Sequence, residues 1–145
     1  MEIDPLEEVA YRLSLAREHF QAALKRMRVD DWVGVVQASQ LAAENAAKAV
    51  IAYFMIPSWS HDPSDELLEI CGRLPPSLQE EARELAAITH ELAPEHGRTS
   101  YGMLEQRLTP SAIYDRETAE KVVKAAEKAL SLARHMLTRL GYPAQ

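Results

Sequence analysis

The residues best suited to acid–base or phosphate chemistry lie between positions 90 and 101. This stretch carries His90, His96, Arg98 and Tyr101. Cleavage of RNA without a metal ion needs a general base for the 2′-hydroxyl proton and a cation for the developing charge, so histidine with arginine is a chemically sensible pair. Arg98 has the planar fork that suits phosphate, and Tyr101 offers a ring for stacking. The stretch therefore predicts a phosphate-binding surface or part of a cleavage site.

A second set of polar residues lies inside an apolar, alanine-rich stretch. Gln40, Glu44 and Lys48 follow one another at steps of four, so a helix would stack them in one row. In the interpretation that we favour, the row is a solvated ridge with an exposed Glu44–Lys48 ion pair worth about 0.2–0.5 kcal/mol. In the alternative, the row lines a groove between helices or subunits, where polar side chains are costly unless they have a role.

The remaining histidines and lysines give weaker signals. His61 precedes Asp62 and fits the capping region of a helix, with a functional base as the alternative role. His90 and His96 have no carboxylate or third histidine at supporting spacing, so we predict no metal site and no cofactor. The lysines between positions 121 and 128 follow glutamates at helical spacing, and exposed ion pairs account for them.

Rows of apolar residues at steps of three and four predict the helices that must position these side chains. The first helix begins at Asp4-Pro5, the second spans residues 32–54, the third long one runs from 75–76 to about 92, and the last follows the cap Asp115 to about residue 140. A short helix is expected over residues 63–71, and no strand is expected. The predicted fold is an all-α, up-and-down antiparallel bundle of four long helices plus one short helix.

Two segments stand out within this bundle. Seven alanines between positions 38 and 52 let neighbouring helices approach closely, so the helix over residues 32–54 is predicted to be central. Residues 95–114 show no helical period and contain two glycines and a proline. A loop of about twenty residues in a compact domain is more often functional than filler, so this segment is expected to contribute to the site.

Composition limits the class of protein. The 145 residues suit a single domain over 1–145, with 47% hydrophobic and 26% charged residues. A net charge of −6 argues against a protein that coats nucleic acid nonspecifically. No apolar run approaches the roughly 18 residues of a membrane span, so we expect no membrane contact and a cytoplasmic location. Cys71 is the only cysteine, which excludes an intrachain disulfide.

Three motifs together resemble the HEPN domains of prokaryotes. They are the stretch QLAAENAAKAVIAYF, which is similar to a Q-x-x-x-E-x-x-x-K central helix, His61 after the following loop, and the Arg-Thr-Ser-Tyr-Gly turn at residues 98–102. The resemblance covers nearly the whole chain. It implies an up-and-down helical bundle that usually forms a homodimer. It also implies a small nucleotidyltransferase encoded beside it as a partner, as in a toxin–antitoxin-like pair.

One branch of that family consists of metal-independent ribonucleases, and the sequence departs from its motif. The branch carries Arg, a polar residue and then His within about six positions, whereas Arg98 is followed by TSYGML. His96 precedes Arg98 instead of following it. Arg83 and His90 have the right separation but lie seven apart in one predicted helix, so we interpret them as a chance match.

We therefore expect a non-catalytic module that binds a nucleotide, an RNA or a substrate of its partner, without catalytic residues of its own. The candidate groove residues are Gln40, Glu44, Lys48, His61, His96, Arg98 and Tyr101. A ribonuclease toxin that uses Arg98 with His96 or His61 is the alternative, and a structural homodimer without a ligand is the third possibility.

Overall fold

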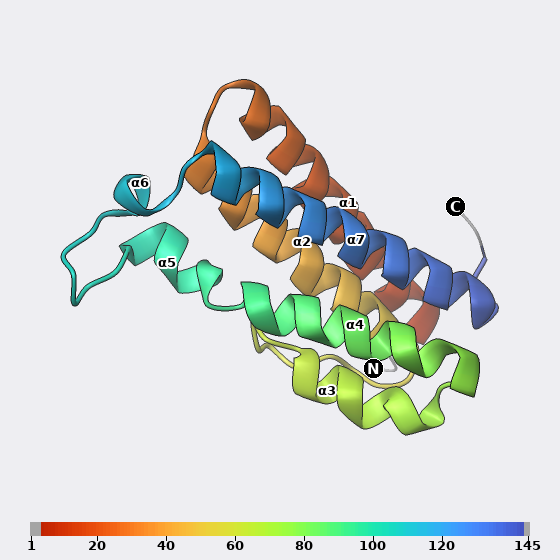
Figure 1. Ribbon diagram of the computed structural model, residues 1–145. Coiled ribbons are helices and arrows are strands. Elements are labelled where there is room, and N and C mark those ends of the chain that lie inside the picture. Colours follow the sequence, from red (N-terminus) through yellow and green to blue (C-terminus); the bar gives the residue numbers. More distant parts are fainter. Residues whose placement is uncertain (1–3, 144–145) are drawn as a thin grey trace.

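The computed structural model describes residues 4–143 as a bundle of helices (Figure 1). Four helices are long: α1 (Pro5–Arg28), α2 (Trp32–Ala52), α4 (Pro76–Leu92) and α7 (Arg116–Arg139). The short ones are α3 (Ser64–Ile70), followed by the 3₁₀ turn η1 (Cys71–Arg73), α5 (Glu95–Tyr101) and α6 (Pro110–Ile113). Residues 4–143 contain no strand, only an isolated bridge between Met103 and Leu108. The predicted all-α bundle is confirmed, with α5 and α6 as additional short helices.

Aspartates begin three of the long helices, as the sequence predicts. The side chains of Asp4, Asp31 and Asp115 accept hydrogen bonds of 2.9, 3.0 and 2.9 Å from backbone amides two or three residues later. Such a cap satisfies an otherwise unpaired amide and stabilises a helix by about 1 kcal/mol. Asp30, with a φ of 58°, turns the chain between α1 and α2. The short turn makes α1 and α2 an antiparallel pair (Figure 1).

Helix α2 is the centre of the bundle. Its seven alanines are all buried, at no more than 5% exposure each. Because these side chains are small, α1, α3, α4, α5 and α7 all pack against α2. The larger buried residues of the core come from α1, α2, α3, α4 and α7, with Leu74 and Tyr142 from the segments after η1 and α7. In the part of the chain that the structure describes, no helix combines the length and apolar character required to span a bilayer.

The segment over residues 95–114 differs most from the prediction. It contains α5, a tight turn in which Met103 and Leu108 exchange two backbone hydrogen bonds of 2.9 and 3.1 Å, and then α6. Gly102 allows this turn, because its φ is 72° and an added Cβ would lie 2.0 Å from the Leu108 carbonyl oxygen. Helices of seven and four residues are too short to display an apolar period. The turn projects from the bundle, whereas α5 lies against α2 (Figure 1).

Candidate functional site

The polar row of α2 is buried. Gln40, Glu44 and Lys48 are 2%, 5% and 3% exposed, so the favoured interpretation of a solvated ridge is wrong. Helix α5 and the chain between α2 and α3 lie over this side of α2, as the contacts of His96 and His61 with the row demonstrate. A buried charge is costly unless it is paired and hydrogen-bonded, so these three residues need partners.

Glu44 is the centre of the hydrogen bonds within the row. Its Oε2 accepts from Lys48 Nζ at 3.1 Å, and its Oε1 accepts from Gln40 Nε2 at 3.0 Å. The Glu44–Lys48 ion pair neutralises the buried charge. Because the amide nitrogen of Gln40 donates to Glu44, its carbonyl oxygen is left to accept from another group.

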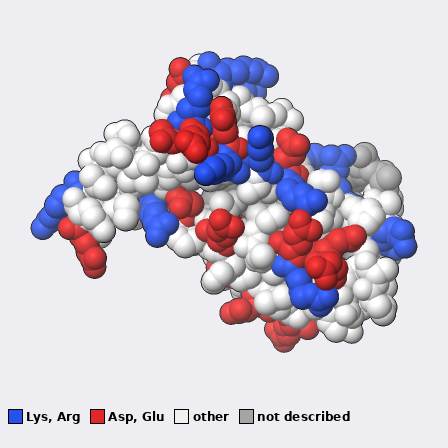
Figure 2. Space-filling model, in the orientation of Figure 1, with Lys and Arg blue, Asp and Glu red and all other residues white. Residues whose placement is uncertain are grey.

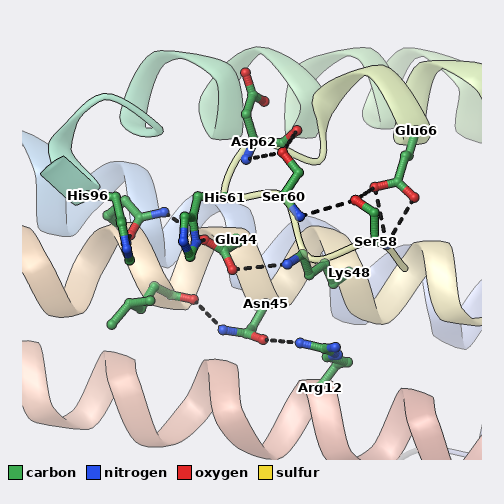
Figure 3. Close-up of polar contacts among 12 residues, drawn as sticks. Arg12, Glu44, Asn45, Lys48, Ser58, Ser60, His61, Asp62, Glu66 and His96 are labelled. Atoms are coloured by element: carbon green, nitrogen blue, oxygen red, sulfur yellow. Dashed lines mark hydrogen bonds and ion pairs between the residues drawn. The ribbon is translucent and has the colours of Figure 1, made fainter. Parts of the chain in front are cut away.

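Two histidines from different parts of the chain complete the cluster. His61 Nδ1 lies 3.1 Å from Glu44 Oε1, and His96 Nδ1 lies 3.1 Å from Gln40 Oε1. The two rings stack, with centroids 3.6 Å apart and planes 19° from parallel. Figure 3 shows the rings side by side next to Glu44. Each Nδ1 faces an oxygen acceptor, so we assign a ring proton to Nδ1 in both histidines. In the neutral ring, Nε2 is then the nitrogen with the lone pair.

The loop between α2 and α3 holds His61 in place. Ser58 donates from its amide and hydroxyl to the carboxylate of Glu66 on α3, the hydroxyl bond being 2.6 Å (Figure 3). Asp62 accepts from a backbone amide at the start of α3 at 3.1 Å and pairs with His90 of α4 at 2.7 Å. Asp62 therefore satisfies the amide of Ser64, the first residue of α3, whereas His61 is directed at α2.

The environment of Asp62 lowers the pKa of its carboxyl group. Burial raises the pKa of its carboxyl, but hydrogen bonds from Ser64 and His90 outweigh that effect, so the pKa is lowered from its ordinary value. The charged form of Asp62 therefore helps to fix the loop.

Arg83 and His90, which have the separation of the ribonuclease motif, do not form a pair. Arg83 pairs with Glu80 at 3.2 Å, and His90 pairs with Asp62.

Arg98 and Tyr101 lie on another side of α5. Residues two positions apart in a helix point in nearly opposite directions, so His96 faces α2 while Arg98 does not. Arg98 Nη1 pairs with Glu95 Oε1 at 3.1 Å, and the buried Tyr114 hydroxyl donates to the same carboxylate. Burial and the neighbouring Glu95 raise the pKa of Tyr114. Tyr101 is 74% exposed. The structure thus joins five of the seven candidate residues and places the other two nearby on the surface of α5.

Asn45 is a buried polar residue that sequence reasoning missed. Its side chain donates to the Leu41 carbonyl at 2.9 Å and accepts from Arg12 of α1 at 3.2 Å (Figure 3). On α1 as well, burial lowers the pKa of His19, with Glu18 and Glu44 opposing the shift. The negative charge of Glu44 therefore acts on His19 of α1, although burial has the larger effect on the pKa of that histidine.

The cluster has the donor types of a metal site. Glu44, His61 and His96 each offer one ligand atom, and these atoms lie within 4.8 Å of one another.

On the face in Figure 2, acidic and basic side chains are interspersed. This pattern gives no broad basic surface on that face, so binding of an anion would depend on local groups such as Arg98.

Comparisons with known proteins agree with this architecture. The family model described as HEPN domain matches residues 9–136. Among solved structures, the crystal structure of TT1696 from Thermus thermophilus has a TM-score of 0.68 and 24% sequence identity. The match covers 89% of this chain and 98% of that one, and it supports the fold. No curated protein matches the sequence significantly.

Proposed function

The chain belongs to the HEPN domain family, and we propose that it is a non-catalytic module that binds a nucleotide or a short RNA segment. The family supports a nucleotide- or RNA-related role in general. The observation that carries the finer proposal is the arrangement of α5. This helix directs His96 at the buried row and presents Arg98 and Tyr101 on the surface.

Arg98 is the group proposed to hold phosphate. Its side chain is 47% exposed, and the pair with Glu95 uses Nη1. A guanidinium has five donors in a planar fork, so a phosphate is able to bind to the others. Glu95 also accepts from Tyr114, which fixes the carboxylate and with it the position of Arg98. Glu95 and Tyr114 are therefore positioning residues for the proposed phosphate contact.

Tyr101 is the group proposed to hold a base. Its ring is largely exposed at the C-terminal end of α5, one helical turn beyond Arg98. Stacking of a base on an aromatic side chain contributes about 1–3 kcal/mol and tolerates any base. A phosphate on Arg98 and a base on Tyr101 together describe a nucleotide-sized ligand without strong sequence preference.

The proposal includes a protein partner. The resemblance of the central-helix and Arg-Thr-Ser-Tyr-Gly motifs to HEPN proteins encoded beside a small nucleotidyltransferase supports such an enzyme as the partner, in a toxin–antitoxin-like pair. The bound nucleotide or RNA would then be that enzyme's substrate or product. A gene for a small nucleotidyltransferase next to this one, with co-purification of the two products, is the expected observation. Failure of the co-expressed pair to co-purify would contradict this part.

Cleavage of RNA is the second candidate, and one observation favours it. Glu44 accepts from His61 Nδ1, as a carboxylate does when it orients a catalytic histidine, and this leaves Nε2 as the atom for a general base. We rank it second because the family's ribonuclease motif lacks its histidine after Arg98. Loss of general-base catalysis alone would reduce cleavage by about 10²–10⁴-fold.

Binding of labelled short RNA and of a nucleoside triphosphate, measured in EDTA, tests the proposal. Arg98→Ala is expected to weaken binding by about 10–100-fold, because a hydrogen bond to a charged group contributes about 1.5–3 kcal/mol. Arg83→Ala is the matched control, since Arg83 is similarly exposed and pairs with a glutamate three residues earlier. Tyr101→Ala is expected to weaken binding while Tyr11→Ala, another exposed tyrosine, does not.

The same mixtures distinguish binding from cleavage. We expect wild-type protein to leave labelled RNA intact in EDTA. Efficient cleavage that disappears in His61→Ala or His96→Ala would replace the proposal with the ribonuclease candidate. Equal affinities of wild type, Arg98→Ala and Arg83→Ala would remove Arg98 from the proposed site.

A further inference from the structure

Three side chains with metal-ligand chemistry converge on one point from three segments of the chain. Glu44 comes from α2, His61 from the loop that follows it, and His96 from α5, and their ligand atoms lie within 4.8 Å of one another. We propose that they bind one divalent transition-metal ion of the Zn²⁺ type and leave one coordination position open. The proposal does not rest on the nucleotide-binding function.

The donor set favours a transition metal over Mg²⁺ or Ca²⁺. Two imidazoles and one carboxylate are ligands of zinc sites that keep an open position, whereas Mg²⁺ and Ca²⁺ prefer oxygen ligands. The 3.1 Å between His61 Nδ1 and Glu44 Oε1 is close to the roughly 3.3 Å between neighbouring ligand atoms in a tetrahedral site with bonds of about 2.0–2.1 Å. The carboxylate and the first histidine are therefore already at coordinating separation.

Residues around the three ligands provide the outer shell that metal sites require. Lys48 binds the Oε2 atom of Glu44 at 3.1 Å, which leaves Oε1 on the side of the histidines. Gln40 contacts both Glu44 and His96 through its amide. Such outer hydrogen bonds fix the orientation of the ligands. Gln40, Glu44 and Lys48 all belong to the buried row of α2, so the carboxylate is held rigidly.

The stacked rings must separate when the ion binds. With bonds of about 2.0–2.1 Å, two imidazoles on one tetrahedral ion have centroids about 5 Å apart, compared with 3.6 Å here. His61 is the ring expected to move, because its side chain is 53% exposed, whereas His96 is only partly exposed. His61 coordinates through Nδ1, the atom next to Glu44, and its ring proton then lies on Nε2. His96 keeps its Nδ1 bond to Gln40 and coordinates through Nε2. Separation of the two stacked rings is therefore the structural change that we expect on metal binding.

Titration of untagged, EDTA-stripped protein with ZnCl₂ tests the site without any nucleotide. We expect one Zn²⁺ per chain by calorimetry and a much weaker response to MgCl₂. His61→Ala and His96→Ala are each expected to lower the Zn²⁺ affinity by at least about tenfold, since even outer-shell partners contribute about 10–100-fold. His135→Ala is the matched control, because His135 forms an exposed pair with Glu81 at the same 3.1 Å.

Two spectroscopic measurements keep the proposal testable if a variant loses stability. Co²⁺ in place of Zn²⁺ should give visible absorption bands of a low-coordinate nitrogen–oxygen site, and Zn²⁺ should shift the NMR signals of the His61 and His96 rings. Equal Zn²⁺ affinity in wild type and His61→Ala, equal affinity for Mg²⁺ and Zn²⁺, or unshifted ring signals would each overturn the proposal. Because nucleotide binding is measured in EDTA, failure of one proposal does not imply failure of the other.

Discussion

The buried Glu44–Lys48 pair makes a strong prediction about stability. Glu44→Gln preserves the size of the side chain but removes its charge, and Lys48, at 3% exposure, then has a buried ammonium without its carboxylate. Breaking a buried ion pair in this way costs about 3–5 kcal/mol. Since a domain has a total stability of about 5–15 kcal/mol, the variant should lose a large fraction of it. Lys48→Met should also lower the free energy of unfolding, because it leaves the buried Glu44 carboxylate without its ammonium partner.

Urea unfolding followed by circular dichroism measures this loss. With a denaturant dependence of about 2 kcal/mol per molar, 3–5 kcal/mol corresponds to a midpoint lower by about 1.5–2.5 M. The double variant Glu44→Leu with Lys48→Met should recover much of the loss, because an apolar replacement of both partners is often neutral or better. Glu80→Gln, which breaks the exposed pair with Arg83, is the control and should change stability by less than about 1 kcal/mol.

A small effect would refute this reasoning. If Glu44→Gln and Glu80→Gln lowered the midpoint equally, the Glu44–Lys48 pair would be solvated in solution. The row would then be the exposed ridge that the helical spacing alone favoured.

Three further predictions concern other parts of the molecule. Gly102→Ala should destabilise by about 1–3 kcal/mol in urea unfolding because of its φ of 72° and the close Leu108 oxygen, whereas Gly97→Ala, with open space around it, should not. Asp62→Asn should destabilise the protein at neutral pH. The difference from wild type should shrink as pH falls below the ordinary carboxyl pKa of 3.8 and through the lowered folded value, in urea unfolding at each pH. Light scattering should give a homodimer of about twice 16.3 kDa, and a monomer at all concentrations would contradict it.

The sequence predicted the framework of this fold well, because its signals are local. Asp31 and Asp115 each precede a regular apolar row, and a cap followed by such a row specifies where a helix begins without reference to the rest of the chain. The alanine content of α2 likewise predicted its central position. Helix α5 was missed because seven residues with one buried side chain, Thr99, carry no periodic signal.

The candidate site was harder to predict, because it depends on contacts between distant residues. Gln40, Glu44 and Lys48 form a row in any helix, but only the covering by α5 and the loop decides that the row is buried. His61 and His96 are 35 positions apart, so no spacing rule predicts that their rings stack. One signal in the sequence did point to burial. The residues on both sides of the row are strongly apolar, and three polar side chains buried among them would be costly without hydrogen-bond partners.

The most direct test of nucleotide binding at α5 is an NMR titration of ¹⁵N-labelled protein with a short RNA and, separately, a nucleoside triphosphate, in EDTA. We predict that the largest shifts occur at α5, in Arg98 and Tyr101 and in the adjoining His96, and that they are lost in Arg98→Ala but kept in Arg83→Ala. Shifts confined to residues outside α5, or no shifts at millimolar ligand, would contradict the proposed site.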